Sequence, residues 1–137
     1  MMVERSMRQK KKSEFLTEVE LEFMTELWDL GEGSVRDVLA KLAPERNLAY
    51  TSAATILRIM EQKDFVTSEK RGKTFVYQPL LAKDAYQAKT LRDLSEKLFD
   101  GTPATMVARL VDDQGMSEET LAEIRALLDR RLNDNDS

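Results

Sequence analysis

Residues 50–79 carry the clearest structural signal in this chain, and they read YTSAATILRIMEQKDFVTSEKRGKTFVYQP. One face of the first half is apolar at helical spacing, and its members are Ala53, Ile56, Leu57 and Met60. This period of about 3.6 residues predicts a helix from about Tyr50 to Lys63 whose apolar side is buried. The polar side of the same helix is then expected to face outward.

The pattern changes after Phe65, where the period falls to about 2 residues, as it does in strands. Two short runs rich in β-branched and aromatic residues, 66–70 and 74–78, lie on either side of Arg71-Gly72-Lys73. A glycine in so short a connection is typical of a β-hairpin, and Pro79 is expected to end its second strand. The stretch therefore predicts a helix followed directly by a hairpin.

Two more helices are expected upstream, because two segments begin with a capping box, in which a side chain at each of two positions caps the backbone of the other. Thr17 with Glu20 caps the first helix, which Gly31 ends, and Ser34 with Asp37 caps the second. The order helix, helix, helix, hairpin is that of a winged helix, a variant of the helix-turn-helix.

The sequence after residue 80 is helical again, with narrower apolar stripes. Its first helix is broken at Gly101-Thr102-Pro103, a short helix follows and ends in a turn from Asp112 to Gly115, and Ser117 caps the last one. Three short helices alone make a poor core, so we expect two copies of the chain to pack together here. The alternative is that this region folds back on its own winged helix. The expected dimer contacts are Leu91, Leu94, Leu98, Phe99, Met106, Val107, Leu110, Leu121, Ile124 and Leu128.

The expected fold is mainly α-helical with one small β-hairpin. We divide the chain into a basic flexible arm at 1–13, a winged-helix domain at 14–80, a helical dimerisation region at 81–133 and a disordered tail at 134–137. No apolar run approaches the roughly 20 residues that span a bilayer. The basic start has no apolar stretch behind it, unlike a secretory signal, so we expect a cytoplasmic protein without membrane insertion.

Composition argues against catalysis. The 137 residues include no cysteine and no histidine, which removes thiolate nucleophiles, the commonest general base and the commonest transition-metal ligand. The sequence contains no P-loop, paired-carboxylate motif or nucleophile elbow. We therefore expect neither an enzyme nor a bound metal or cofactor.

The formal net charge of −4 hides an uneven distribution. Residues 1–80 contain 13 Lys and Arg against 13 Asp and Glu, whereas residues 81–137 contain 8 against 12. Nucleic acids are recognised by one face of a protein rather than by its total charge. The basic residues gather at 5–12 and 70–73, so the first 80 residues remain compatible with a DNA partner.

A winged helix reads DNA by laying its third helix in the major groove. The outward side of that helix carries Thr51, Ser52, Thr55, Arg58 and Gln62. Arginine can fork onto guanine, glutamine onto adenine, and threonine can touch a thymine methyl group. We expect these side chains to contact DNA, and Tyr50 at the start of the helix either contacts the DNA backbone or packs.

Two basic segments are expected to contact phosphates. In the hairpin they are Arg71, Lys73 and Thr74, around a glycine that lets the backbone approach the DNA. In the arm, Arg8, Lys10, Lys11 and Lys12 either reach an adjacent groove or belong to a disordered tail.

Several motifs together resemble the penicillinase-repressor family (BlaI, MecI and CopY). They are Leu16-Thr17-Glu18 with Trp28, Leu48-Ala49-Tyr50-Thr51, Lys70-Arg71-Gly72-Lys73 followed by Val76-Tyr77-Gln78-Pro79-Leu80, and Leu98-Phe99-Asp100-Gly101-Thr102-Pro103. The resemblance covers about residues 14–132. It implies a homodimeric transcriptional repressor that binds a palindromic operator through an N-terminal winged helix and blocks polymerase.

The resemblance also implies how the repressor is released. In the antibiotic-responsive branch, a membrane sensor with a metalloprotease domain triggers cleavage of the repressor within the tail. By motif position that bond is expected near Arg109-Leu110 here, where staphylococcal members carry Asn-Phe. The copper-responsive branch ends in a cysteine-rich metal motif, and a chain without cysteine lacks that mode.

We therefore expect a sequence-specific DNA-binding repressor that a signal acting on the C-terminal region releases, with a sensor protease or another protease as a further partner. The alternative is a winged helix used for protein interactions without specific DNA binding. The acidic net charge is the best argument for that alternative.

Overall fold

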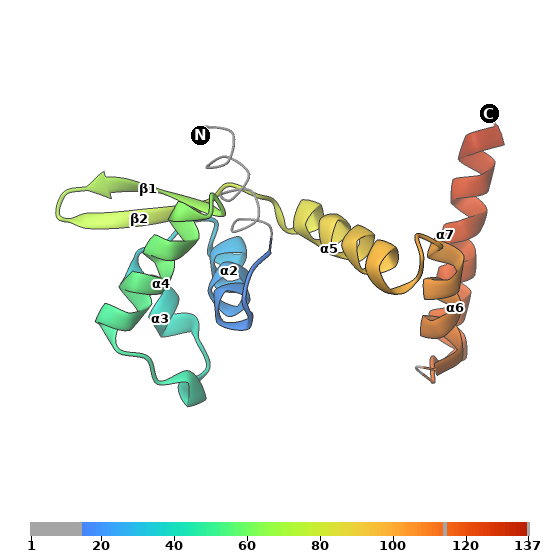
Figure 1. Ribbon diagram of the computed structural model, residues 1–137, viewed down its shortest axis with the longest axis horizontal. Coiled ribbons are helices and arrows are strands. Elements are labelled where there is room, and N and C mark those ends of the chain that lie inside the picture. The colour runs from blue at the N-terminus through green and yellow to red at the C-terminus, as the bar shows by residue number, and fades with distance from the viewer. Residues whose placement is uncertain (1–14, 114, 137) are drawn as a thin grey trace. The chain divides into compact units, whose positions relative to one another are not determined.

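The computed structural model describes residues 15–113 and 115–136 (Figure 1). Its elements are α2 (Glu18–Leu30), α3 (Val35–Lys41), the 3-10 turn η1 (Pro44–Arg46), α4 (Tyr50–Gln62), β1 (Val66–Arg71), β2 (Thr74–Pro79), α5 (Lys83–Leu98), α6 (Pro103–Asp113) and α7 (Glu118–Asp136). The chain forms two compact units that divide between Thr90 and Leu91, within α5.

The N-terminal unit has the expected order of three helices and a hairpin. β1 and β2 pair antiparallel, with Arg71 opposite Thr74, so the turn contains only Gly72 and Lys73. Arg71 therefore belongs to a strand, and the turn is one residue shorter than the sequence predicted. Gly72 has φ 66°, a conformation that is accessible to glycine because it lacks a Cβ atom.

Both capping boxes are confirmed. The Thr17 hydroxyl accepts from the Glu20 amide at 3.2 Å, and the Glu20 carboxylate accepts from the Thr17 amide at 2.8 Å. Ser34 and Asp37 make the same exchange at the start of α3. These local bonds satisfy amides that no earlier helical turn can pair, which is why the sequence alone located both helix starts.

The core lies between α2, α3, α4 and the hairpin. Its members with the lowest exposure are Phe23, Met24, Leu27, Val38, Ala53, Leu57, Met60 and Val66. On α2, Leu21 is 40% exposed, whereas Phe23, two residues later, is fully buried in the core. On α4 the prediction is confirmed, because the buried stripe is the expected one and Ile56 packs partly against it.

The first turns of α5 belong to the N-terminal unit. Tyr86 is buried, its hydroxyl accepts from the Leu16 amide at 2.9 Å, and its ring lies 6.0 Å from the rings of both Trp28 and Phe65. Trp28 donates its indole N–H to the carbonyl of Leu81 at 2.8 Å. The expected domain boundary at 80/81 is therefore about ten residues too early, because aromatic packing extends the first unit into α5.

We expect Tyr86→Phe to lower the free energy of unfolding by about 1 kcal/mol, since it removes one hydrogen bond and keeps the ring. Urea unfolding followed by circular dichroism measures this change. Tyr50→Phe is the matched control, because Tyr50 is 51% exposed, and it should leave the free energy almost unchanged. Equal stability of the two variants would show that the Tyr86 hydroxyl does not hold α5 to the unit.

The C-terminal unit consists of the rest of α5 with α6 and α7. The helix α6 continues to Asp113, so the turn expected from Asp112 starts later. The helix α7 runs to Asp136, which corrects the expectation of a disordered tail from residue 134. Along the described residues, no helix has the length and apolar character needed to cross a membrane.

Candidate nucleic-acid interface

The outward face of α4 is the first part of the candidate interface. Thr51, Ser52, Thr55, Arg58 and Gln62 are all exposed, as the helical spacing predicted. The Thr55 hydroxyl donates to the Thr51 carbonyl at 3.0 Å, which leaves its methyl group and an oxygen lone pair for other contacts. The helix therefore presents a row of polar side chains opposite its buried stripe.

Ile59 lies within this row and was missed by the sequence reasoning. It stands four residues after Thr55, so both side chains lie on the same face, and it is 40% exposed. An exposed aliphatic group on a reading helix can contact a thymine methyl group. Helical spacing alone places Ile59 on this face, although its side chain is apolar and its neighbours there are polar.

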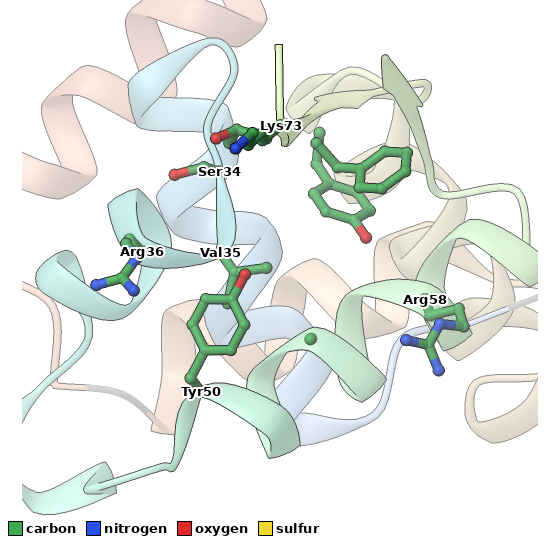
Figure 2. A pocket seen from close by; sticks show the side chains of 10 residues that line it. Ser34, Val35, Arg36, Tyr50, Arg58 and Lys73 are labelled. Atoms are coloured by element: carbon green, nitrogen blue, oxygen red, sulfur yellow. The ribbon is translucent and has the colours of Figure 1, made fainter. Parts of the chain in front are cut away.

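A cleft of about 270 Å³ lies beside this face, between α3, α4 and the hairpin (Figure 2). Its charged lining residues are Arg36, Arg58 and Lys73, and no carboxylate is present among the described residues that line it. Its hydroxyl groups come from Ser34, Tyr50, Thr74 and Tyr77. Three cations and several hydroxyl groups around one hollow suit an anion such as a phosphate.

Arg36 is the second residue that the sequence reasoning missed. Its guanidinium lies 5.4 Å from the centre of the Tyr50 ring, a cation–π distance, and this contact joins α3 to the start of α4. Tyr50 is thereby both packed and accessible, so its two expected roles are compatible. The only signal for Arg36 was its place on the polar side of α3, which many solvent-facing residues share.

Burial changes the chemistry of one hydroxyl group in the cleft. Burial raises the pKa of the Tyr77 phenol above its ordinary value, with Glu61 adding to the effect. Like an ordinary tyrosine, Tyr77 is protonated at neutral pH and can donate a hydrogen bond.

The hairpin places its three expected phosphate contacts differently. Lys73 and Thr74 are exposed and line the cleft. Arg71 instead lies in ion pairs with Glu32 and Glu69. These pairs raise the pKa of Arg71, and the hydrogen bonds from Arg71 and then Gln78 hold the pKa of Glu32 below its ordinary value. Arg71 is thus already bound within the protein.

The arm residues Arg8, Lys10, Lys11 and Lys12 lie outside the described residues. Within 15–113 and 115–136, there is no group of three or more acidic side chains placed to hold a metal ion.

The expected dimer contacts and the Arg109-Leu110 bond lie in the C-terminal unit. All ten apolar residues are exposed or only partly buried in the single chain. Five of them line an apolar groove of about 190 Å³, namely Leu91, Leu94, Phe99, Met106 and Leu110. Arg109 is exposed on α6 and pairs with Asp113 one turn later at 3.2 Å.

Residues 16–130, which make up most of the chain, match the sequence model of the penicillinase repressor family. The chain belongs to the penicillinase repressor family. It is 21% identical to the methicillin resistance regulatory protein MecI of Staphylococcus aureus, over 85% of this chain and 94% of that protein. It is 23% identical to the penicillinase repressor of Bacillus licheniformis, over 90% of this chain and 96% of that protein.

Among solved structures, an ArsR-like transcriptional regulator from Rhodococcus sp. RHA1 is similar with a TM-score of 0.44 and 21% identity, over 73% of this chain and 86% of that one. The match to the penicillinase repressor family confirms the resemblance found in the motifs. The family is one of transcriptional repressors, and the named relatives are regulators rather than enzymes.

Proposed function

We propose that this chain is a homodimeric repressor that binds a palindromic DNA operator. The observation that carries the proposal is the set of exposed polar and cationic side chains on the outward face of α4 and around the adjacent cleft. A face of this kind beside a basic hairpin matches what a winged helix needs to read a major groove.

The proposed contacts divide into two groups. Arg58 and Gln62 on α4 have the donors that bind guanine and adenine edges, and Ile59 offers an apolar contact to thymine. The cleft residues Arg36 and Lys73 bind the phosphates beside the groove and fix the position of the helix. Base contacts supply sequence discrimination, whereas phosphate contacts supply affinity that falls with salt.

Dimer formation is supported by the exposure of the C-terminal unit. Among the described residues, all the buried hydrophobic side chains lie before Leu91. The helices of the second unit instead carry exposed leucines. The exposed fraction is 51% for Leu91, 42% for Leu94 and 68% for Leu98. Helices with so little buried apolar surface need a partner, and a second copy offers the same complementary stripes.

We propose that release acts on this same unit. The Arg109-Leu110 bond lies inside α6, and proteases cleave extended rather than helical backbone, so α6 must open locally before it is cut. The side chains of this helix are exposed or only partly buried in the single chain, so local opening breaks few apolar contacts within it. Cleavage there would separate part of the dimer contacts from the DNA-binding unit.

The alternative function is a protein-interaction module, and binding to DNA from the region upstream of its own gene separates the two. Fluorescence anisotropy at several salt concentrations is the measurement. A specific repressor gives a steep loss of affinity with salt and protects a palindrome in footprinting. Absence of binding at low salt would contradict the proposed function and favour the alternative.

We expect Arg58→Ala to weaken operator binding by about 1–3 kcal/mol and to relax the preference for one base pair in each half-site. Arg130→Ala is the control, because Arg130 is an exposed arginine on the side of α7 opposite Leu121 and Leu128, and its loss removes the same charge. Operator variants changed at single base pairs show which position loses its discrimination. An Arg58→Ala protein that keeps full affinity and discrimination would remove Arg58 from the reading face.

A further inference from the structure

Arg71 is held by two carboxylates of its own chain. Both terminal nitrogens of its guanidinium donate to the Glu32 carboxylate, with Nη2 to Oε1 at 3.1 Å, and Nη2 also donates to Glu69 at 3.0 Å. Gln78 donates a further hydrogen bond to Glu32 at 3.0 Å. The cation that the sequence assigned to a DNA phosphate is therefore already paired with carboxylates of its own chain.

The backbone explains why Glu32 lies beside the hairpin. Its neighbour Gly33 forms an isolated antiparallel bridge with Tyr77, with N–H to carbonyl distances of 2.9 and 2.8 Å. A Cβ atom at Gly33 would lie 3.2 Å from Leu30 and 3.3 Å from Asp37, so glycine suits this tight position. The bridge fixes the loop between α2 and α3 against β2 and so places the preceding residue, Glu32, beside Arg71.

The geometry of this pair resembles the contact that DNA would make. A carboxylate and a phosphate both offer two oxygens to the fork of a guanidinium. The side chains of Arg71 and Glu32 remain 45% and 41% exposed, and ion pairs of this exposure are weak enough for another anion to compete. A phosphate must therefore displace the Glu32 carboxylate before it can bind the Arg71 guanidinium.

We propose that Glu32 competes with DNA phosphates for Arg71 and so lowers the affinity of the hairpin for any duplex. This inference rests on the proposed function. Non-specific binding depends almost entirely on phosphate contacts, whereas the bases are read by α4. An internal anion at Arg71 therefore lowers the affinity for random DNA and for an operator by a similar factor, because both duplexes offer the same phosphates.

The experiment uses the full chain with Glu32→Gln, Arg71→Gln and the double variant. Glu123→Gln is the control, because it removes the same charge from an exposed residue of the other compact unit. Each protein is titrated with a short duplex of mixed sequence and with the upstream DNA, at several salt concentrations.

We expect Glu32→Gln to bind random DNA on the order of tenfold more tightly at low salt, with a salt slope steeper by about 0.9 per protomer. Its affinity for the upstream DNA should rise by a similar factor, because a phosphate contact does not depend on the base sequence. Arg71→Gln alone should change random binding little, because Glu32 already occupies Arg71. In the double variant the gain from Glu32→Gln should disappear.

Three results would overturn the inference. A gain of equal size with and without Arg71 would mean that Glu32 only repels DNA through its charge. Glu32→Gln binding that equals the original chain would mean that no competition takes place. A large loss with Arg71→Gln that the double variant does not restore would mean that Arg71 already binds phosphate, because the double variant lacks the Glu32 charge that Arg71→Gln leaves unpaired. If the original chain binds neither duplex, the proposed function fails as well.

Discussion

Replacing both Leu91 and Leu94 by alanine is expected to lower operator affinity by about 10²–10⁴-fold. Two DNA-binding units joined in a dimer bind far more tightly than one unit alone. Both leucines line the apolar groove of the C-terminal unit and lie outside the N-terminal core. The variant should sediment as a single chain at concentrations where the original protein is a dimer. Its remaining affinity should equal that of one DNA-binding unit for one half-site of the operator.

The matched control for this variant is Arg92→Ala with Glu96→Ala. These two exposed residues lie on the same helix but on the side away from the leucines, and the double change leaves the net charge unaltered. The control should remain dimeric and bind the operator fully. Sedimentation equilibrium and anisotropy test both proteins, and circular dichroism checks that each is folded. A leucine variant that keeps full operator affinity would contradict the link between dimer formation and repression.

The parts of this fold that could be predicted from the sequence depend on residues close together in the chain. The capping boxes at Thr17 and Ser34 and the stripe on α4 involve partners three or four residues apart. The hairpin was equally visible, because its strands are joined by a turn of two residues. In each case the sequence pattern favours one local structure. The packing of the folded chain favours the same structure.

The parts that could not be predicted depend on contacts between distant residues. Tyr86 reaches Leu16, 70 positions earlier, and this contact moves the domain boundary into α5. Arg71 meets Glu32 from 39 positions away, so a cation that looks available in the sequence is paired in the structure. Helical spacing places Arg36 on a polar surface, but only the packing of α3 against α4 brings it to the cleft.

The helix α4 has one buried face and one exposed face, so substitutions on the two faces should have very different effects. Leu57→Ala should lower the free energy of unfolding by about 2–5 kcal/mol, because Leu57 has 0% exposure and its loss leaves a cavity in the core. For a unit of this size each kcal/mol corresponds to a fall in Tm of about 4–8 °C. Thermal unfolding followed by circular dichroism measures the change.

Ile59→Ala is the matched comparison for Leu57→Ala, since it removes an aliphatic side chain two residues further along the same helix. Ile59 is 40% exposed, so its loss should change stability by less than about 1 kcal/mol. If Ile59 contacts a thymine methyl group, the same change should weaken operator binding, whereas any Leu57→Ala protein that stays folded should bind through an intact reading face. Equal destabilisation by the two variants would mean that α4 is packed on both sides, and a helix packed on both sides cannot enter a major groove.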